Sequence, residues 1–184
     1  ERARCEWLNG NFSDAELLLE SVLTRACTLV ERAAAFQLMA YVLATKGELL
    51  RSAEISIEAL KLFGIELTLH PTKEDVVSAY ARIGQQIGER SVESFIDLPT
   101  MENAETQAAM GLLSNLIVSA YLTNENLFFM IPCHMVRLSL RYGNTDASAL
   151  GYSCFGIALG SAFGNYKEGY HFGKLAFDLV ERGN

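Results

Sequence analysis

Apolar side chains recur at intervals of three and four residues through most of the chain, which is the spacing of one face of an α-helix. Short polar turns interrupt this pattern. After Gly10, Gly47 and Gly164 the chain repeats one phrase, with a bulky residue two positions later and a small residue five positions later. A glycine in the left-handed conformation ends a helix at low cost, and a small residue in the next helix lets two backbones approach closely. Each phrase therefore predicts the turn of a helical hairpin.

The middle of the chain lacks this phrase but keeps the helical spacing. Thr72 is followed by Lys, Glu and Asp, a pattern that favours an N-cap and a helix start. We expect the helix after Thr72 to pair with a short helix that begins at Ser91 and stops before Pro99. The other helices predicted here span 104–122, 125–142 with a kink at Pro132, and the stretch that starts at Asn144 or Thr145 and ends at Gly164.

Together these patterns predict an all-α fold of about ten helices in five antiparallel pairs. The stretch 66–72 is the only one that looks extended, and we interpret it as a loop between the second and third pairs. This loop and Pro132 are expected to be weak joints. Because each pair hides its apolar face against the next, we expect residues 1–184 to form a single helical-repeat domain. The chain starts at Glu1 within a helical pattern, and we interpret it as a fragment of a longer protein.

The recurring phrase resembles the tetratricopeptide repeat, in which a turn glycine is followed by an aromatic residue and by small residues at fixed spacing. The matching positions are Gly10, Phe12, Ala15 and Val22 in one unit, Gly47, Leu49, Ser52 and Ala59 in a second, and Gly164, Tyr166, Gly169 and Ala176 in a third. Ser52 and Gly169 stand where alanine is usual, and Leu49 replaces the aromatic residue. The resemblance implies a tetratricopeptide-like right-handed solenoid of about five antiparallel helix hairpins.

The order of segments over nearly the whole chain resembles the helical region of large bacterial multidomain signalling kinases. The sequence segments on which the resemblance rests are "RCEWLNGNFSDAELLLESVLTRA", "IEALKLFGIELTLHPTKEDV", "SFIDLPTM", "FFMIPCHMVRLSLRYGN" and "GYSCFGIALGSAFGNYKEGYHFGKLAFDLVER". In that family a serine/threonine-kinase-like domain and an AAA-type ATPase module precede the helical region, and a GAF domain and a histidine kinase follow it. The resemblance therefore implies a non-catalytic part of an ATP-dependent protein kinase.

Composition narrows the classes of function. The net charge of −7 disfavours a nucleic-acid partner, which needs a basic face. The longest apolar stretch, Gly111 to Leu122, is too short to cross a bilayer, and no signal peptide is visible, so no direct membrane contact is expected. The scattered cysteines are typical of buried thiols in a reduced cytoplasm. They are Cys5, Cys27, Cys133 and Cys154.

No residue pattern indicates catalysis, a cofactor or a metal. A phosphate-binding loop of the form GxxxxGK[ST] and a kinase signature are both missing, so we expect this fragment not to be an enzyme. Cys133-His134 is interpreted as a kinked helix with a buried thiol and a partly exposed imidazole, because further metal ligands do not converge there. The glycines of "GYSCFGIALGSAFG" are interpreted as sites of close helix packing rather than as a nucleotide loop.

A binding face is the remaining candidate site. In tetratricopeptide arrays the first helix of each pair lines the concave face, which implies that Gln37, Tyr41 and Thr45 of one unit lie there, with Cys154, Ala158 and Ser161 of another. The Lys and Asn residues of the peptide-carboxylate clamp are missing, which disfavours a cochaperone. Trp7 is interpreted as a packing residue at the first turn.

Three functions remain open at this point. The first is a protein-interaction and signal-relay module of a multidomain bacterial sensor kinase, whose partner is another domain of the same chain or a signalling protein. The second is a ligand-sensing helical solenoid of an ATPase-type transcriptional regulator, which would take a small-molecule effector. The third is a stand-alone helical enzyme. A histidine kinase downstream of the fragment would favour the first, and a helix-turn-helix domain the second.

Overall fold

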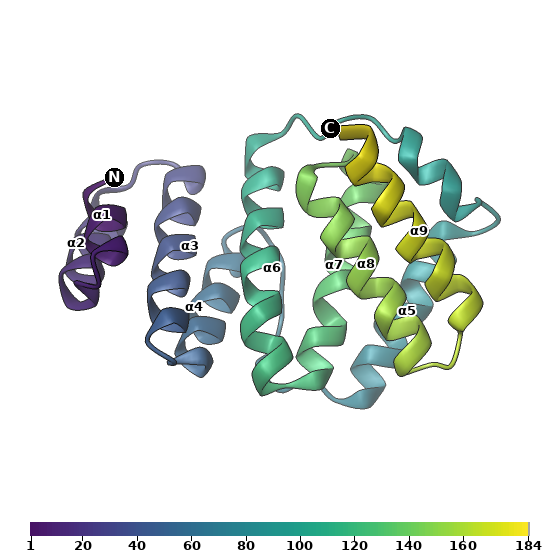
Figure 1. Ribbon diagram of the computed structural model, residues 1–184, viewed down its shortest axis with the longest axis horizontal. Helices are drawn as coiled ribbons and strands as arrows, with labels where there is room; N and C mark the ends of the chain where they lie inside the picture. Colours follow the sequence, from purple (N-terminus) through teal and green to yellow (C-terminus); the bar gives the residue numbers. More distant parts are fainter. Residues whose placement is uncertain (184) are drawn as a thin grey trace.

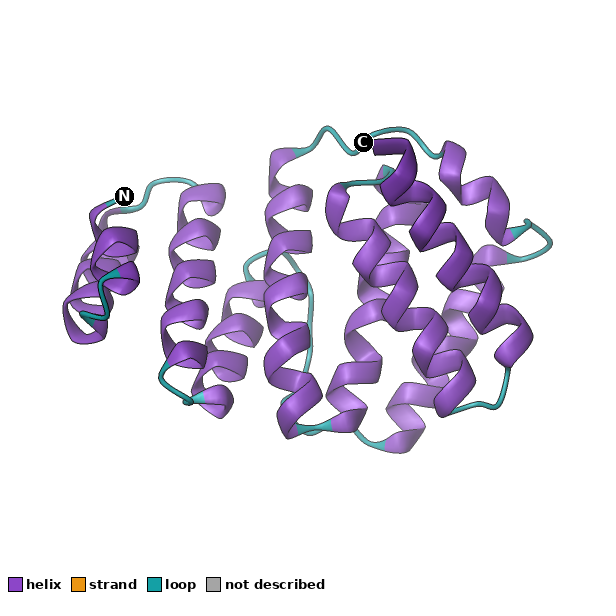
Figure 2. Cartoon of the chain, in the orientation of Figure 1, coloured by secondary structure: helices purple, strands orange, loops and turns teal. Residues whose placement is uncertain are grey.

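Helices account for almost all regular structure in the computed structural model of the protein, which describes residues 1–183 (Figure 1, Figure 2). In this range no strand is present, and only an isolated bridge joins Thr100 to Asn144. The all-α prediction is therefore confirmed. In chain order the elements are α1 (Arg2–Leu8), α2 (Phe12–Arg25), α3 (Leu29–Thr45), α4 (Leu49–Lys61), α5 (Lys73–Ile87), the 3-10 helix η1 (Val92–Asp97), α6 (Ala104–Thr123), α7 (Glu125–Tyr142), α8 (Asp146–Ser161) and α9 (Tyr166–Gly183).

The predicted glycine turns lie where the helices change direction. Gly10, Gly47 and Gly164 have φ angles of 82°, 81° and 66°, in the left-handed region that favours glycine. A Cβ added at any of the three would meet no atom within 4 Å. The backbone conformation, rather than lack of space, therefore explains why glycine is needed at these turns.

Helices that follow one another in the chain also pack side by side through most of the molecule. The contacts run from α1 to α2, α2 to α3 and α3 to α4, and then from α6 to α7, α7 to α8 and α8 to α9. The chain crosses from the first group to the second where α6 packs against both α3 and α4. In Figure 1, α1 and α2 accordingly lie at one end of the molecule, and α7, α8 and α9 lie toward the other.

The expected third hairpin is not formed in the way the sequence suggested. Instead of pairing with each other, α5 packs mainly on α7, and η1 packs on α9. The apolar face of α5 is longer than the six-residue η1 could cover, and Tyr80 on that face stacks on Phe155 of α8 at 4.6 Å between ring centroids. Helix α5 and η1 therefore form an insertion that packs on the α6–α9 group. The prediction of five consecutive hairpins is wrong at this point.

The connection between α4 and α5 is anchored, contrary to the expectation of a weak joint. Ile65 and Leu67 are buried in the main core, and Asn126 at the start of α7 donates to the Pro71 carbonyl oxygen at 3.0 Å. Pro132 is buried inside α7, which continues through it from Glu125 to Tyr142. Both expected joints therefore lie within the packed structure.

Close backbone contact joins α8 to α9. A Cβ on Gly169 would lie 2.7 Å from the Gly156 carbonyl oxygen, and a Cβ on Gly156 would lie 2.7 Å from the Gly169 carbonyl oxygen. A Cβ on Gly151 would lie 2.7 Å from Cβ of Met135 on α7. The packing interpretation of the glycines in this stretch is confirmed at these positions.

Asn144 fixes the segment between η1 and α6 to the turn between α7 and α8. Its side chain donates to the Phe95 carbonyl oxygen and accepts from the Tyr152 hydroxyl, both at 2.8 Å. Its backbone N–H donates to Pro99 at 2.7 Å, and its carbonyl oxygen accepts from Met101 at 2.8 Å. Of the two residues proposed to cap α8, the neighbouring Thr145 is the one that does so.

Candidate binding surfaces

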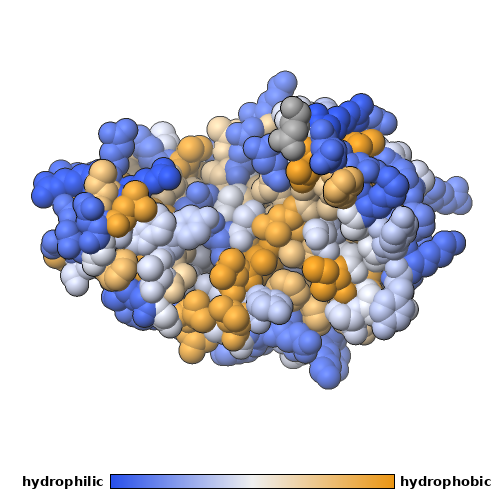
Figure 3. Space-filling view, viewed as in Figure 1, coloured by the Kyte–Doolittle hydropathy of each residue, from blue (hydrophilic) through white to orange (hydrophobic). Residues whose placement is uncertain are grey.

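The main candidate surface is formed by three helices that pack in a row. Helix α6 contacts α3 on one side and α8 on the other. Large apolar side chains of all three are exposed to solvent, with exposed fractions of 57% for Val118 and 54% for Ile157. In Figure 3 hydrophobic atoms gather over the middle of this side of the molecule, where α6 and α8 lie. We call this surface the first-helix face, and its members are Tyr41 of α3, Val118 and Leu122 of α6, and Leu150 and Ile157 of α8.

The centre of the first-helix face carries no charge. Glu105 is the only charged residue of α6 and Asp146 is the only one of α8, and both stand in the first turn of their helix. Among the half-buried residues between the exposed apolar side chains, Ser114, Asn115 and Ser153 are polar but uncharged. A contiguous exposed apolar patch of this kind is typical of a site for another protein surface. A surface of this kind is chemically complementary to another apolar, uncharged surface.

The three residues proposed on α3 have different surroundings. The Gln37 amide nitrogen donates to the Ala108 carbonyl oxygen of α6 at 3.2 Å, and Asn115 donates to the Gln37 carbonyl oxygen at 3.3 Å. Gln37 is half-buried and joins α3 to α6, so it supports the face rather than standing free on it. Tyr41 and Thr45 are exposed.

On α8 only one of the three proposed positions lies on the exposed side. Cys154 and Ala158 are buried, with exposed fractions of 5% and 0%, so they belong to the core. Ser161 is exposed, and its hydroxyl donates to the Ile157 carbonyl oxygen at 2.9 Å. Leu150 and Ile157 occupy the open side instead. Because α8 is apolar on nearly all sides, its sequence pattern does not distinguish the open side from the buried one.

Sequence reasoning missed the contribution of α6, the central helix of the face. No turn glycine precedes α6, so the repeat phrase that marked the other units could not place it. The available signal was the pair Val118 and Leu122, four residues apart, in a helix with a single charge. That signal alone does not separate an exposed side from a buried one.

Trp7 extends the surface toward the end of the molecule. Its indole ring stacks on Tyr41 with 6.0 Å between centroids, and its N–H donates to the Thr45 hydroxyl at 3.1 Å. The Thr45 hydroxyl in turn donates to the Tyr41 carbonyl oxygen at 2.8 Å. Two of the proposed face residues therefore hold α1 against α3.

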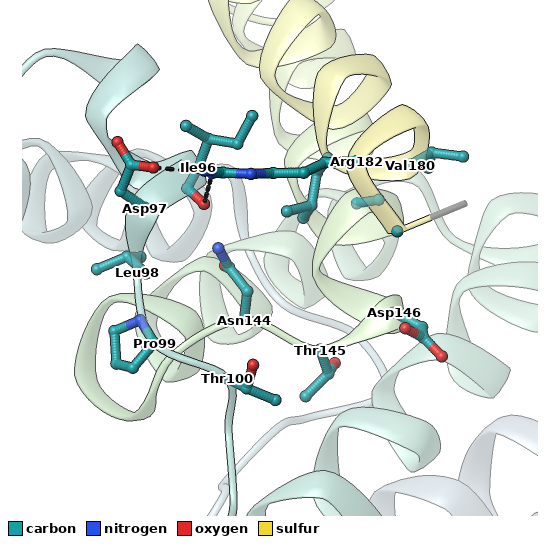
Figure 4. Close-up of a pocket in the computed structure, with 13 residues that line it drawn as sticks. Ile96, Asp97, Leu98, Pro99, Thr100, Asn144, Thr145, Asp146, Val180 and Arg182 are labelled. Atoms are coloured by element: carbon teal, nitrogen blue, oxygen red, sulfur yellow. Dashed lines mark hydrogen bonds and ion pairs between the residues drawn. The ribbon is translucent and has the colours of Figure 1, made fainter.

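A cavity of about 710 Å³ lies where the end of α9 approaches η1 and the start of α8 (Figure 4). Arg182 reaches across one side and donates to the Ile96 carbonyl oxygen at 3.1 Å and to the Asp97 carboxylate at 2.8 Å. Thr145 and Asp146 line the other side. The buried Asn144 in its wall already has all its polar atoms bonded, so the cavity has the size of a ligand site without a free buried polar group to fix a ligand.

The Cys133 thiol, which was considered as a nucleophile, lies in surroundings that do not activate it. Burial raises the pKa of the Cys133 thiol, so its nucleophilic thiolate form is disfavoured. Among residues 1–183 no cluster of three or more His, Cys, Asp or Glu side chains could hold a metal ion. Cys5 and Cys27 are exposed, which corrects the expectation that all four thiols are buried. Across the same range no helix is both long and apolar enough to cross a membrane.

Comparison of the chain with protein-family models, with curated proteins and with solved structures found no match. The assignment of a function therefore rests on the geometry of the surfaces described above and on the sequence patterns.

Proposed function

We propose that the chain is a non-catalytic protein-interaction and signal-relay module of a multidomain bacterial signalling kinase, acting in the cytoplasm. Its helices would form a tetratricopeptide-like right-handed solenoid in which α1–α2, α3–α4, α6–α7 and α8–α9 are the hairpins. The turn glycines and the side-by-side packing of consecutive helices support this architecture.

The observation that carries the proposal is the uncharged apolar face shared by α3, α6 and α8. Val118 and Ile157 are each more than half exposed, and α6 and α8 carry charged residues only in their first turns. Retaining such a surface has a cost in solubility, and a partner that covers it removes that cost. The partner would be an apolar protein segment, from another domain of the same protein or from a signalling partner.

The relay role rests on the resemblance to the helical region of signalling kinases. A domain between an ATPase and a histidine kinase passes a signal if its partner binds one state of the neighbouring domains better than the other. Because the α4–α5 connection and Pro132 are packed, we place the relay in binding and release at the first-helix face rather than in bending at these joints.

The test is kinase output from the full-length protein that carries the domain. Val118→Asp together with Ile157→Asp would put two charges at the centre of the face, and we expect the response to the signal to be lost while basal kinase activity remains. Val77→Asp is the matched control, because Val77 is 55% exposed on α5 and lies outside the first-helix face. An unchanged response in the double variant would refute the proposal.

The cavity in Figure 4 favours a second candidate, a ligand-sensing solenoid of an ATPase-type transcriptional regulator. Its volume of about 710 Å³ lies within the range of small-molecule sites, which is roughly 300–1,000 Å³. The sequence that follows residue 184 in the gene separates the two candidates. A histidine kinase supports the relay module, and a helix-turn-helix domain supports the sensor.

A further inference from the structure

A small cavity between α5 and α7 is lined by basic side chains from both helices. Arg82 comes from α5, and His134 and Arg137 come from α7. The cavity measures about 80 Å³ and lies away from the first-helix face. It is too small for a cofactor or a drug-sized ligand, since such sites measure roughly 300–1,000 Å³. A single compact group is the largest ligand that it accommodates.

The two arginines lack acidic partners even though the protein has 22 acidic and 15 basic residues. In residues 1–183 neither Arg82 nor Arg137 forms an ion pair with a carboxylate. The carboxylate that Arg82 influences is Asp75, two turns earlier on α5, and it is bound to Thr72 in the capping box. Both arginines are exposed, and they line the same small space without a carboxylate partner.

His134 is half-buried, and its contact with Arg137 indicates which ring nitrogen carries the proton. Arg137 Nη2 lies 3.1 Å from His134 Nδ1, and because a guanidinium can only donate, Nδ1 is the acceptor. The proton of the neutral imidazole is then on Nε2. Burial, together with the positive charges of Arg137 and Arg82, lowers the pKa of His134 to about 4, which agrees with a neutral ring. The Cys133 thiol points elsewhere, to the Phe129 carbonyl oxygen at 3.7 Å.

We propose that this cavity between α5 and α7 binds a phosphate group, either as the free ion or as the monoester of a small molecule. Guanidinium groups present paired N–H donors that match the oxygen atoms of phosphate. Arg82 and Arg137 supply these donors and the positive charge, and His134 supplies a neutral donor. The packing of α5 on α7 brings both arginines to the same cavity.

The proposal is tested by NMR titration of the protein with inorganic phosphate near pH 7, followed through the His134 ring and the arginine side-chain resonances. Bound phosphate, a monoanion near pH 4, offsets the positive charges that disfavour the imidazolium form. A pH titration of the His134 ring with phosphate present should therefore give a pKa above about 4. His70 and His171 serve as internal references in the same spectra. Arg82→Gln and Arg137→Gln should each weaken phosphate binding about tenfold or more. Arg141→Gln removes the same charge from α7 outside the cavity and should leave binding unchanged.

Titration with chloride at the same ionic strength separates binding from screening. If chloride shifts the same resonances equally, or if Arg141→Gln weakens phosphate binding as much as Arg82→Gln does, the proposal is overturned. Glycerol phosphate distinguishes the two sources of the group. Tighter binding of the monoester identifies a small-molecule phosphate as the ligand, whereas tighter binding of inorganic phosphate identifies the free ion.

Discussion

The two ends of the molecule bury their apolar residues in different ways. Between α1, α2 and α3 the buried side chains form a small cluster of mostly small and aliphatic residues, which includes Ala15, Leu19 and Leu43. From α4 to α9 the core is much larger and contains aromatic and Met side chains such as Tyr152, Phe172 and Met110. Figure 1 shows that α1 and α2 meet the rest of the molecule on one side only.

The difference in size between the two buried clusters predicts that stability is distributed unevenly along the molecule. In an array of hairpins each unit gains stability from its neighbours, and an end unit has only one. The α1–α2 hairpin is held by its small cluster and by the contacts of Trp7 with Tyr41 and Thr45. We therefore expect it to open locally while the α4–α9 core stays folded.

The largest effect is expected from cavities made in the two clusters. Leu113→Ala empties a fully buried site in α6 and should lower the free energy of unfolding by about 2–5 kcal/mol. Leu19→Ala removes a side chain of similar burial from the small cluster. It should speed amide exchange in residues 2–25 far more than in α6–α9, because only the α1–α2 hairpin depends on it. Hydrogen exchange with mass spectrometry measures both, and equal loss of protection across the molecule in the Leu19 variant would contradict the comparison.

A second prediction concerns the close packing of α8 on α9. Gly169→Leu places a side chain where a Cβ already lies 2.7 Å from a backbone oxygen, and it should destabilise the protein by about 1–3 kcal/mol. Gly173→Leu is the matched control on the same helix, since nothing lies within 4 Å of its Cβ position. The control should be neutral or stabilise by up to about 1 kcal/mol through helix propensity. Thermal denaturation measures the difference. Equal melting temperatures for the two variants would show that α8 and α9 can move apart without loss of stability.

Removing a helix cap is expected to have a smaller effect on the free energy of unfolding. Thr28 caps α3 and Thr72 caps α5, and replacing either by Ala should cost about 1 kcal/mol. Hydrogen bonds from the backbone N–H groups of Thr28 and Thr72 lower the pKa of Glu31 and of Asp75, respectively.

These shifts give the helix starts a pH dependence with a definite sign. A carboxyl group whose pKa is lower in the folded protein contributes its full stabilisation above its unfolded pKa, and this is lost as the pH falls through the folded pKa. Stability should therefore decrease below about pH 4, and less steeply in the variants Glu31→Gln and Asp75→Asn. Melting curves at pH 7 and pH 3.5 measure this, and an identical decrease in wild type and variants would show that the capping boxes play no part.

Local signals in the sequence predicted the helices well, because their causes lie within a few residues. The turns at Gly10, Gly47 and Gly164 need the left-handed conformation, and the caps Thr72 and Thr145 bond to backbone groups in the first turn of their own helices. Each of these features depends on residues that are close in the sequence.

Which helix packs on which, and which side stays open, could not be predicted in the same way. Helix α5 packs mainly on α7, and its Tyr80 stacks on Phe155 of α8, which lies 75 positions later in the sequence. Neither contact has a local sign in the sequence. Cys154 and Ile157 differ in burial because α8 lies between other helices, although both are apolar and lie in the same turn. The sequence indicates Asn144 only as a possible cap of α8. Its hydrogen bonds to Phe95, Pro99 and Met101 reach a distant segment and have no sequence pattern.

The proposed binding of a protein partner to the first-helix face is best tested by photo-cross-linking in the full-length protein. A cross-linking amino acid at position 118 should give a discrete product with a partner segment, and the same amino acid at position 77 should give none. The two valines have nearly equal exposure, 57% and 55%, so accessibility alone cannot produce a difference. No product from position 118, or equal products from both positions, would contradict the account.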